Sequence, residues 1–234
     1  MKQLFLLMSL IAIVTSCSNE NENSSKLSQN QLTLYSGDTA TLTYNGTCKW
    51  SSDQPLIASV DNGAVKGLLI GETYIRANNE ACKVTVKPNY TMYVDPYIDW
   101  ESNASEFSKY MYKHGCKEMS SDSSGGLWID ESTNTLYLYL LNNGKISSTC
   151  IMTSLYKTEN LTKFLCERFI PLGYEDGMAV FINIDRNTGI TEMINSDYKD
   201  EYALWALAIP YDTRTNSDDI IKKFRQLYTL TIEQ

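Results

Sequence analysis

The sequence predicts a mixed fold of two domains: a small all-β sandwich over residues 26–88 and an α+β domain over residues 89–234. Short alternating apolar runs, separated by regularly spaced turn residues, predict the sandwich. After Lys87-Pro88-Asn89 helical patterns alternate with strand patterns, which predicts the second domain. The chain has 234 residues, of which 43% are apolar and 21% charged, so it can bury cores of this size.

The charge balance and the histidine count exclude several classes of function. Twenty basic against 28 acidic residues give a net charge of -8, which repels phosphate backbones, so nucleic acid is not expected as a partner. His114 is the single histidine, which removes the commonest general base and the commonest neutral metal ligand. We therefore expect neither a metal centre nor a cofactor.

The N-terminus has the order of charge, apolar run and small residues that is typical of a secretory signal. Met1-Lys2 precedes the apolar run Leu4 to Val14, which is followed by Thr15-Ser16-Cys17. The run covers about 11 residues, whereas a membrane-spanning helix needs about 20. We therefore expect residues 1–17 to be a signal peptide and not a membrane-spanning helix.

The cysteine directly after Val14-Thr15-Ser16 resembles the lipobox of bacterial lipoproteins. The resemblance implies that Cys17 is acylated and anchors the mature chain to a membrane, and an ordinary secretory signal is the alternative. Residues 18–25 are polar and acidic, which predicts a flexible tether. An acidic stretch in this place resembles the surface-export signal of Bacteroidota-type lipoproteins and implies an outer-membrane protein that faces the cell exterior. The periplasmic face is the alternative.

Strand and turn signals alternate through residues 26–88. Short polar segments that contain glycine, such as Ser36-Gly37-Asp38 and Asn45-Gly46, indicate hairpin turns or strand ends. The expected strands are Leu32–Tyr35, Ala40–Tyr44, Cys48–Ser52, Ile57–Asp61, Ala64–Gly67, Gly71–Ala77 and Ala81–Val86.

These runs resemble the group 2 bacterial immunoglobulin-like domain. The matching residues are Trp50-Ser51-Ser52, Ala58-x-Val60-Asp61-x-x-Gly63 with the following Val65, Gly71 with Ile75, and Val84-Thr85-Val86. The resemblance implies a rigid spacer module, and it implies that Trp50 is a core residue.

Cys48 and Cys82 depart from that family pattern and are a candidate disulfide. A sandwich of this size is marginally stable, and an exported protein can form such a bond, worth roughly 3–4 kcal/mol. Cys116, Cys150 and Cys166 leave room for one further pair, whose connectivity the sequence does not determine.

The second domain begins with a helix signal. Asn103-Ala104-Ser105-Glu106 predicts a capping box, and Gly115 predicts the helix end. Strands are expected at 116–122, 127–130, 135–141 and 145–156, and Thr158 is expected to cap a second helix. It is followed by strands at 178–185, 190–195 and 202–211, with a turn over Arg186-Asn187-Thr188-Gly189.

This order predicts an internal duplication, with repeats at about 101–156 and 157–212. Two units of a helix followed by antiparallel strands would form one sheet with helices on one face. A further helix is predicted from about Ser217 to Tyr228. The segment Tyr93–Trp100 resembles the inter-domain junction of uncharacterised gut Bacteroidota surface lipoproteins, a group from which no activity carries over.

No recognisable catalytic motif occurs in the chain. Asp95, Asp99 and Glu101 form the densest carboxylate group beside aromatic residues, and such residues are the parts of a glycoside hydrolase. We favour the interpretation that they are a solvated acidic linker and residues that approach the helix, since similar Asp density recurs in ordinary turns. The candidate ligand-stacking aromatics are four residues expected on a sheet face without helices: Trp128, Tyr137, Tyr139 and Trp205.

The sequence therefore favours a non-enzymatic cell-surface lipoprotein for adhesion or ligand binding, with the immunoglobulin-like module as spacer. The expected ligand is a glycan or an extracellular protein. One alternative is a carbohydrate-active hydrolase that uses acidic residues within Asp95–Glu101, and the other is a structural component of a surface assembly.

Substituting Cys17 by Ser tests the lipid anchor. The unaltered protein, extracted from membranes, should give a mass spectrum of a chain that starts at acylated Cys17, because only the thiol carries the diacyl group. Cys17→Ser should lose the acyl mass and leave the membrane fraction. An unmodified N-terminus at another residue of the unaltered protein would contradict the lipobox.

Overall fold

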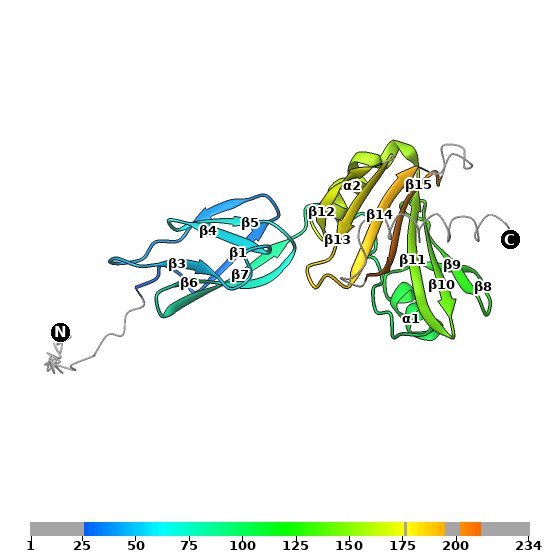
Figure 1. The fold of residues 1–234 in the computed structure, drawn as a ribbon, viewed down its shortest axis with the longest axis horizontal. Helices are drawn as coiled ribbons and strands as arrows, with labels where there is room; N and C mark the ends of the chain where they lie inside the picture. Colours follow the sequence, from blue (N-terminus) through cyan, green and yellow to red (C-terminus); the bar gives the residue numbers. More distant parts are fainter. Residues whose placement is uncertain (1–25, 176, 195–201, 212–234) are drawn as a thin grey trace, which may run out of the picture.

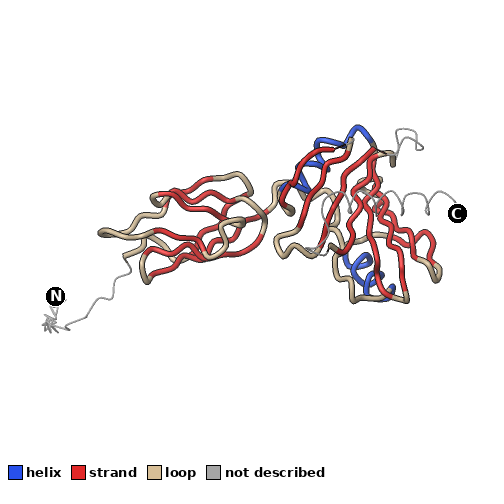
Figure 2. The backbone as a smooth tube through the Cα atoms, viewed as in Figure 1, coloured by secondary structure: helices blue, strands red, loops and turns tan. Residues whose placement is uncertain are grey.

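The computed structural model describes residues 26–175, 177–194 and 202–211, and about half of them are in β-strands (Figures 1 and 2). The predicted signal peptide with Cys17, the tether at 18–25 and the helix from about Ser217 lie outside the described residues. Within them the strands form three sheets, which confirms that the fold is rich in β-structure.

Two small sheets are formed by residues 31–87. The four-stranded sheet has the order β1-β7-β6-β3, with β1 parallel to β7, and the three-stranded sheet has the order β2-β5-β4. The strands are β1 (Gln31–Tyr35), β2 (Thr39–Thr41), β3 (Trp50–Ser52), β4 (Ala58–Asp61), β5 (Ala64–Gly67), β6 (Gly71–Ala77) and β7 (Glu80–Lys87).

Alternating burial along these strands builds one hydrophobic cluster between the two sheets. In β6 and β7 every second residue is buried, as the period of two of a half-buried strand requires. Trp50 packs against the cluster from β3. Asn62 and Gly63, both with positive φ, form the tight turn between β4 and β5, where a Cβ on Gly63 would lie 2.3 Å from the Leu42 carbonyl oxygen. The fully buried members are Leu27, Leu34, Leu42, Ala58, Val65, Ile75, Ala77, Cys82, Val84 and Val86.

The candidate disulfide between Cys48 and Cys82 is not formed, since both thiols are free. Trp50, two residues after Cys48, pairs with Ala77 of β6, whereas Cys82 lies on β7 and pairs with Ile75 on the same strand β6. Strand β6 thus lies between β7, which carries Cys82, and β3, which begins two residues after Cys48.

The remaining elements follow the order helix and four strands, twice. The first set is α1 (Ala104–Lys113), β8 (Lys117–Ser121), β9 (Gly125–Asp130), β10 (Thr135–Asn142) and β11 (Lys145–Thr153). After the short 3₁₀ helix η1 (Leu155–Lys157), the second set is α2 (Thr158–Cys166), β12 (Ile170–Glu175), β13 (Met178–Ile182), β14 (Thr188–Ile194) and β15 (Leu204–Pro210). All eight strands join one antiparallel sheet of order β12-β13-β14-β15-β11-β10-β9-β8.

The two helices begin differently. The predicted capping box at α1 is confirmed: the Asn103 side chain accepts from the Ser105 and Glu106 backbone N–H groups, and the Glu106 carboxylate accepts from the Asn103 N–H. The prediction that Thr158 caps α2 is wrong. Thr158 is the first helical residue, and its hydroxyl donates to the Leu155 carbonyl in η1.

The structure also differs from the sequence prediction at strand β12 and at the turn after β13. Strand β12 was not predicted, because Pro171 and Gly173 interrupt its sequence pattern. The two residues flank an irregularity in the pairing of β12 with β13. Strand β12 lies at the edge of the sheet, where proline is tolerated. The turn after β13 lies at 183–187 instead of 186–189. Its cause is Asn183, whose side-chain oxygen accepts from the Asn187 and Thr188 N–H groups and allows β14 to start at Thr188.

One face of the large sheet, here called the inner face, packs against both helices. Phe107 and Met111 of α1 and Leu161, Phe164 and Leu165 of α2 share a buried cluster with sheet residues. The sheet members are Trp128, Tyr137, Tyr139, Ile146, Ile151, Phe181, Ile190, Leu204, Ala206 and Ala208. The opposite, outer face holds a separate cluster of Cys150, Met152, Met178, Val180, Trp205, Leu207 and Ile209.

Glu167, at the end of α2, joins the large sheet to the small sheets. Its buried carboxylate accepts from the backbone N–H groups of Asn89 (2.9 and 3.1 Å) and Tyr90 (3.0 Å) and from the Asn89 side-chain amide (3.1 Å). Its carbonyl oxygen accepts from the Ile70 N–H at 2.7 Å, and the Asn89 amide also donates to the Ser36 carbonyl. Glu167 thus binds the start of the second part through its carboxylate and the small sheets through its backbone carbonyl.

Replacing Glu167 by Ala should destabilise the protein by about 2–4 kcal/mol, because the Asn89 and Tyr90 N–H groups would lose their buried acceptor. Chemical denaturation followed by circular dichroism measures this loss. Glu159→Ala on the same helix is the matched control: its side chain is 80% exposed and pairs only with Lys163, so the midpoint should barely move. Equal effects of the two substitutions would contradict the role given to Glu167.

Candidate ligand-binding site

The four predicted stacking aromatics are buried, so the expectation that they lie exposed on an uncovered face is wrong. Trp128, Tyr137, Tyr139 and Trp205 are 0, 4, 1 and 4% exposed. Tyr137 pairs with Trp128 across β9 and β10, which places both on the inner face beneath the helices. Trp205 belongs to the outer cluster. None of them offers a free ring face for a sugar.

Each of these rings has a structural contact instead. The Tyr137 hydroxyl accepts from the Val94 N–H at 2.9 Å, and the Tyr139 ring packs on Phe107 with centroids 4.5 Å apart. The Trp205 indole N–H donates to the Tyr202 carbonyl at 2.7 Å. Burial raises the pKa of Tyr137, as expected for a hydroxyl inside a core.

The carboxylates proposed for a hydrolase have separate surroundings. Asp95 is paired with Arg168 at 2.6 Å, Glu101 is exposed and paired with Lys145, and the Asp99 carboxylate accepts from the Glu101 N–H. Arg168 is itself held over the Phe164 ring, 3.7 Å from its centroid. Salt bridges and a local turn account for all three carboxylates, and only Asp95 borders one of the hollows described below.

The described thiols are poor nucleophiles. Cys116, Cys150 and Cys166 are free, and burial raises the pKa of each; for Cys116 the value is about 11. His114 is exposed and caps α1, and its ring Nδ1 lies 2.8 Å from the Tyr110 carbonyl. A thiolate–imidazole pair is therefore not built here.

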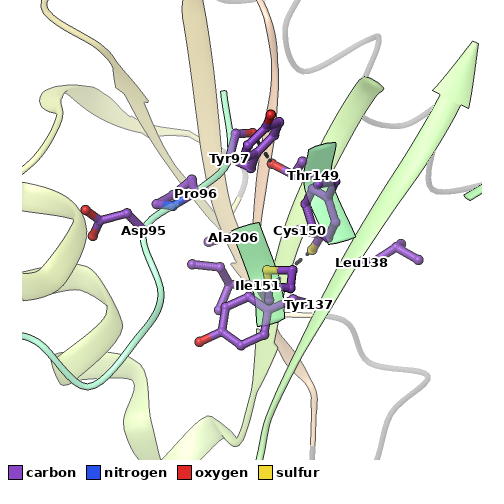
Figure 3. A pocket seen from close by; sticks show the side chains of 11 residues that line it. Asp95, Pro96, Tyr97, Tyr137, Leu138, Thr149, Cys150, Ile151 and Ala206 are labelled. Carbon is purple, nitrogen blue, oxygen red and sulfur yellow. Dashed lines mark hydrogen bonds between the residues drawn. The ribbon is translucent and has the colours of Figure 1, made fainter. Parts of the chain in front are cut away.

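A small hollow lies where the segment 95–97 crosses the inner face (Figure 3). Its volume is about 10 Å³, which is room for one water molecule at most. Tyr97 borders it and accepts a hydrogen bond from the Thr149 hydroxyl at 3.0 Å. This hollow is too small for a ligand.

A much larger hollow, of about 560 Å³, lies on the outer face over the β8–β10 side of the sheet. This volume is within the range of small-molecule sites. Its floor is apolar and comes from four strands: Leu127 on β9, Leu136, Leu138 and Leu140 on β10, Met152 on β11 and Trp205 on β15. Its rim is polar and consists of Ser120, Ser121, Asp122 and Ser124, with Gly125 and Gly126 beside it. We call this hollow the outer-face site.

Asp122 is the one titratable residue among the described residues that line the outer-face site. Its carboxylate accepts from the Ser124 N–H at 2.7 Å and from the Gly125 N–H at 3.2 Å. Hydrogen bonds from Ser124 hold its pKa below the usual range, so the group is anionic at neutral pH. A lone carboxylate of this kind can orient a ligand but offers no acid–base pair.

The strand alternation that placed the aromatics inside also placed the leucines of the site outside. Tyr137 and Tyr139 alternate with Leu136, Leu138 and Leu140 along β10, so the two sets face opposite ways. The sequence analysis placed the ligand on the aromatic residues, whereas the alternating leucines are the residues that indicate this hollow.

Comparison with protein-family models, with curated proteins and with solved structures finds no match for this chain. No helix in the described part of the chain is long and apolar enough to cross a membrane. Over the same residues no group of three or more His, Cys, Asp or Glu side chains is placed to hold a metal ion.

One further buried carboxylate lies apart from the site. Glu192 of β14 is on the inner face, where the Thr162 hydroxyl of α2 contacts its two carboxylate oxygens at 2.8 and 2.9 Å. Burial raises its pKa, with the Thr162 hydrogen bond opposing the shift. A carboxyl group with a raised folded-state pKa stabilises the fold below its unfolded pKa, and this contribution is lost as pH rises through the folded pKa.

Glu192→Gln should remove the loss of stability that occurs as pH rises, because the amide is neutral at every pH. The unfolding free energy of the variant, relative to that of the unaltered protein, should rise from about pH 4.5 upward, because Glu192 ionises in the unfolded state before it does so in the folded protein. Urea titrations at pH 4, 5.5 and 7 measure this difference. The exposed Glu159→Gln is the control and should show no such rise, whereas parallel pH profiles for Glu192→Gln would contradict the burial effect.

Proposed function

We propose that this protein is a non-enzymatic cell-surface lipoprotein that binds a ligand in the outer-face site. In this proposal Cys17 anchors the chain in the outer membrane, facing the cell exterior, and residues 26–88 hold the binding domain away from the lipid surface. The observation that carries the proposal is the hollow of about 560 Å³, with its apolar floor and its single described carboxylate.

The domain organisation is part of the proposal. Residues 26–88 would be a bacterial immunoglobulin-like sandwich, supported by two packed sheets around a common cluster and by the Asn62-Gly63 turn. Residues 89–234 would be an α+β domain, supported by the shared packing of α1 and α2 on the inner face.

The internal duplication also receives support. The two helices start at Ala104 and Thr158, 54 residues apart, and the first strands after them start at Lys117 and Ile170, 53 residues apart. The sheet order is symmetrical about the β15–β11 pair, with each repeat supplying one half. Two copies of one helix-and-four-strand unit would produce this order.

The chemistry of the outer-face site supports binding over catalysis. Its described lining lacks a second titratable group to act with Asp122, and the carboxylates of Asp95 and Glu101 are engaged in ion pairs elsewhere. Because its floor is aliphatic and the candidate stacking rings are buried, a ligand with an apolar part fits better than a bare sugar.

The first experiment is a binding screen with residues 26–234, which contain every described packing contact. Panels of glycans, extracellular proteins and apolar small molecules are offered, and each binder is analysed for reaction products. Saturable binding of a molecule with an apolar part, without product, is expected. Turnover of any bound molecule would overturn the proposal.

Leu138→Asn locates the binding. It puts an amide into the floor of the site and should weaken binding about tenfold or more, because the apolar contact is lost. Leu172→Asn on β12 is the matched control, since Leu172 is half exposed and lies outside this hollow. Equal affinity of the Leu138 variant and the control would show that the ligand binds elsewhere.

A further inference from the structure

We propose that the ligand of the outer-face site is a single-chain amphiphile, an unbranched aliphatic chain with a neutral or cationic head group that donates hydrogen bonds. The chain would lie on the leucine floor and the head would meet Asp122. This inference rests on the proposed function and names the class of ligand.

The floor is elongated because its side chains stand in cross-strand rows. In one row Ser120 is opposite Leu127, Leu127 is opposite Leu138, and Leu138 is opposite Cys150. In the next row Leu136 is opposite Met152, which is opposite Trp205. Both rows run across the strands.

The length of the floor follows from the strand order. From β8 to β15 the sheet passes through β9, β10 and β11, which is four strand spacings or about 19 Å. The hollow is therefore polar at the β8 end and apolar toward β15, where Trp205 lines it. A linear chain with one polar end matches this distribution.

The floor selects an aliphatic chain over a polyhydroxylated ligand. Leu127, Leu136, Leu138 and Leu140 carry no hydrogen-bonding atoms, so hydroxyl groups lying on them would lose water without gaining a partner. Apolar surface gains free energy in the same place.

The charge at the polar end selects the head group. Asp122 is anionic at neutral pH, one of its oxygens accepts the turn N–H groups, and its carboxylate lies at the rim. The net charge of -8 adds to the repulsion of anions. An ammonium or hydroxyl head complements this rim, and a carboxylate or phosphate head does not.

Three probes of equal chain length test the inference: decylamine, decan-1-ol and decanoate, each titrated calorimetrically into residues 26–234 below its aggregation concentration. The amine and the alcohol should bind, and decanoate should bind about three- to fivefold more weakly than the alcohol, since exposed charge pairs have effects of this size. Decanoate binding as tightly as the amine would overturn the inference.

Asp122→Asn isolates the head-group contact. It should weaken decylamine binding about three- to fivefold, leave decan-1-ol unchanged and strengthen decanoate. Asp185→Asn, which makes the same charge change outside the hollow, is the matched control and should alter none of the three. An equal effect of both variants on decylamine would mean that only the overall charge acts, and the inference would fail.

Leu138→Asn separates this inference from the proposed function. If none of the three probes binds, but a molecule from the screen binds in a Leu138-dependent way, the amphiphile inference is wrong and the proposed site stands. If the probes bind and the substitution does not weaken them, the proposed site is wrong as well. Loss of all probe binding in Leu138→Asn, with Leu172→Asn unchanged, supports both.

Discussion

Glu167 is the constraint on which the relation between the two halves of the chain depends, because its buried carboxylate binds the backbone at Asn89 and Tyr90 and its carbonyl oxygen binds the Ile70 N–H. A buried carboxylate is costly unless its lone pairs are satisfied, and the donors that satisfy it come from the backbone at Asn89 and Tyr90. The end of α2 and the start of the second half are thereby held together. Arg168, stacked on Phe164 and paired with Asp95, holds the continuation of the same segment. The path of residues 89–95 over α2 is thus determined by two adjacent side chains.

Because side chains alternate between the two faces of a strand, the large sheet carries different residues on its inner and outer faces. On β10, Tyr137 and Tyr139 face the helices and complete the inner core, so Leu136, Leu138 and Leu140 face the other way. Gly125 and Gly126 let β9 approach β10 closely, because a Cβ at either position would lie 2.2 to 2.6 Å from Tyr139 atoms. The floor of the outer-face site is in this sense the reverse side of a tightly packed core.

A sheet built in this way suits binding better than reaction. Strand pairing sets side chains in cross-strand rows, and in the outer-face site these rows form an apolar floor with a polar rim at Ser120, Ser121, Asp122 and Ser124. The polar groups elsewhere are used for structure: Asn103 caps α1, Asn183 shapes the turn before β14, and Glu192 contacts Thr162. The proposed ligand is accordingly one that needs a long apolar contact and a single polar point.

Local signals in the sequence determined the elements whose cause is local. The capping box at Asn103, the Asn62-Gly63 turn and the strand starting at Thr135 follow from neighbouring residues alone. Strand β12 was not predicted, because Pro171 and Gly173 interrupt its strand pattern at a sheet edge. Tertiary structure alone decided which face of the sheet the helices cover, and hence that Trp128 is core and Leu138 lines a hollow. Alternation along a strand defines two faces but does not determine which of them the helices cover. That is determined only when α1 and α2 pack on one face.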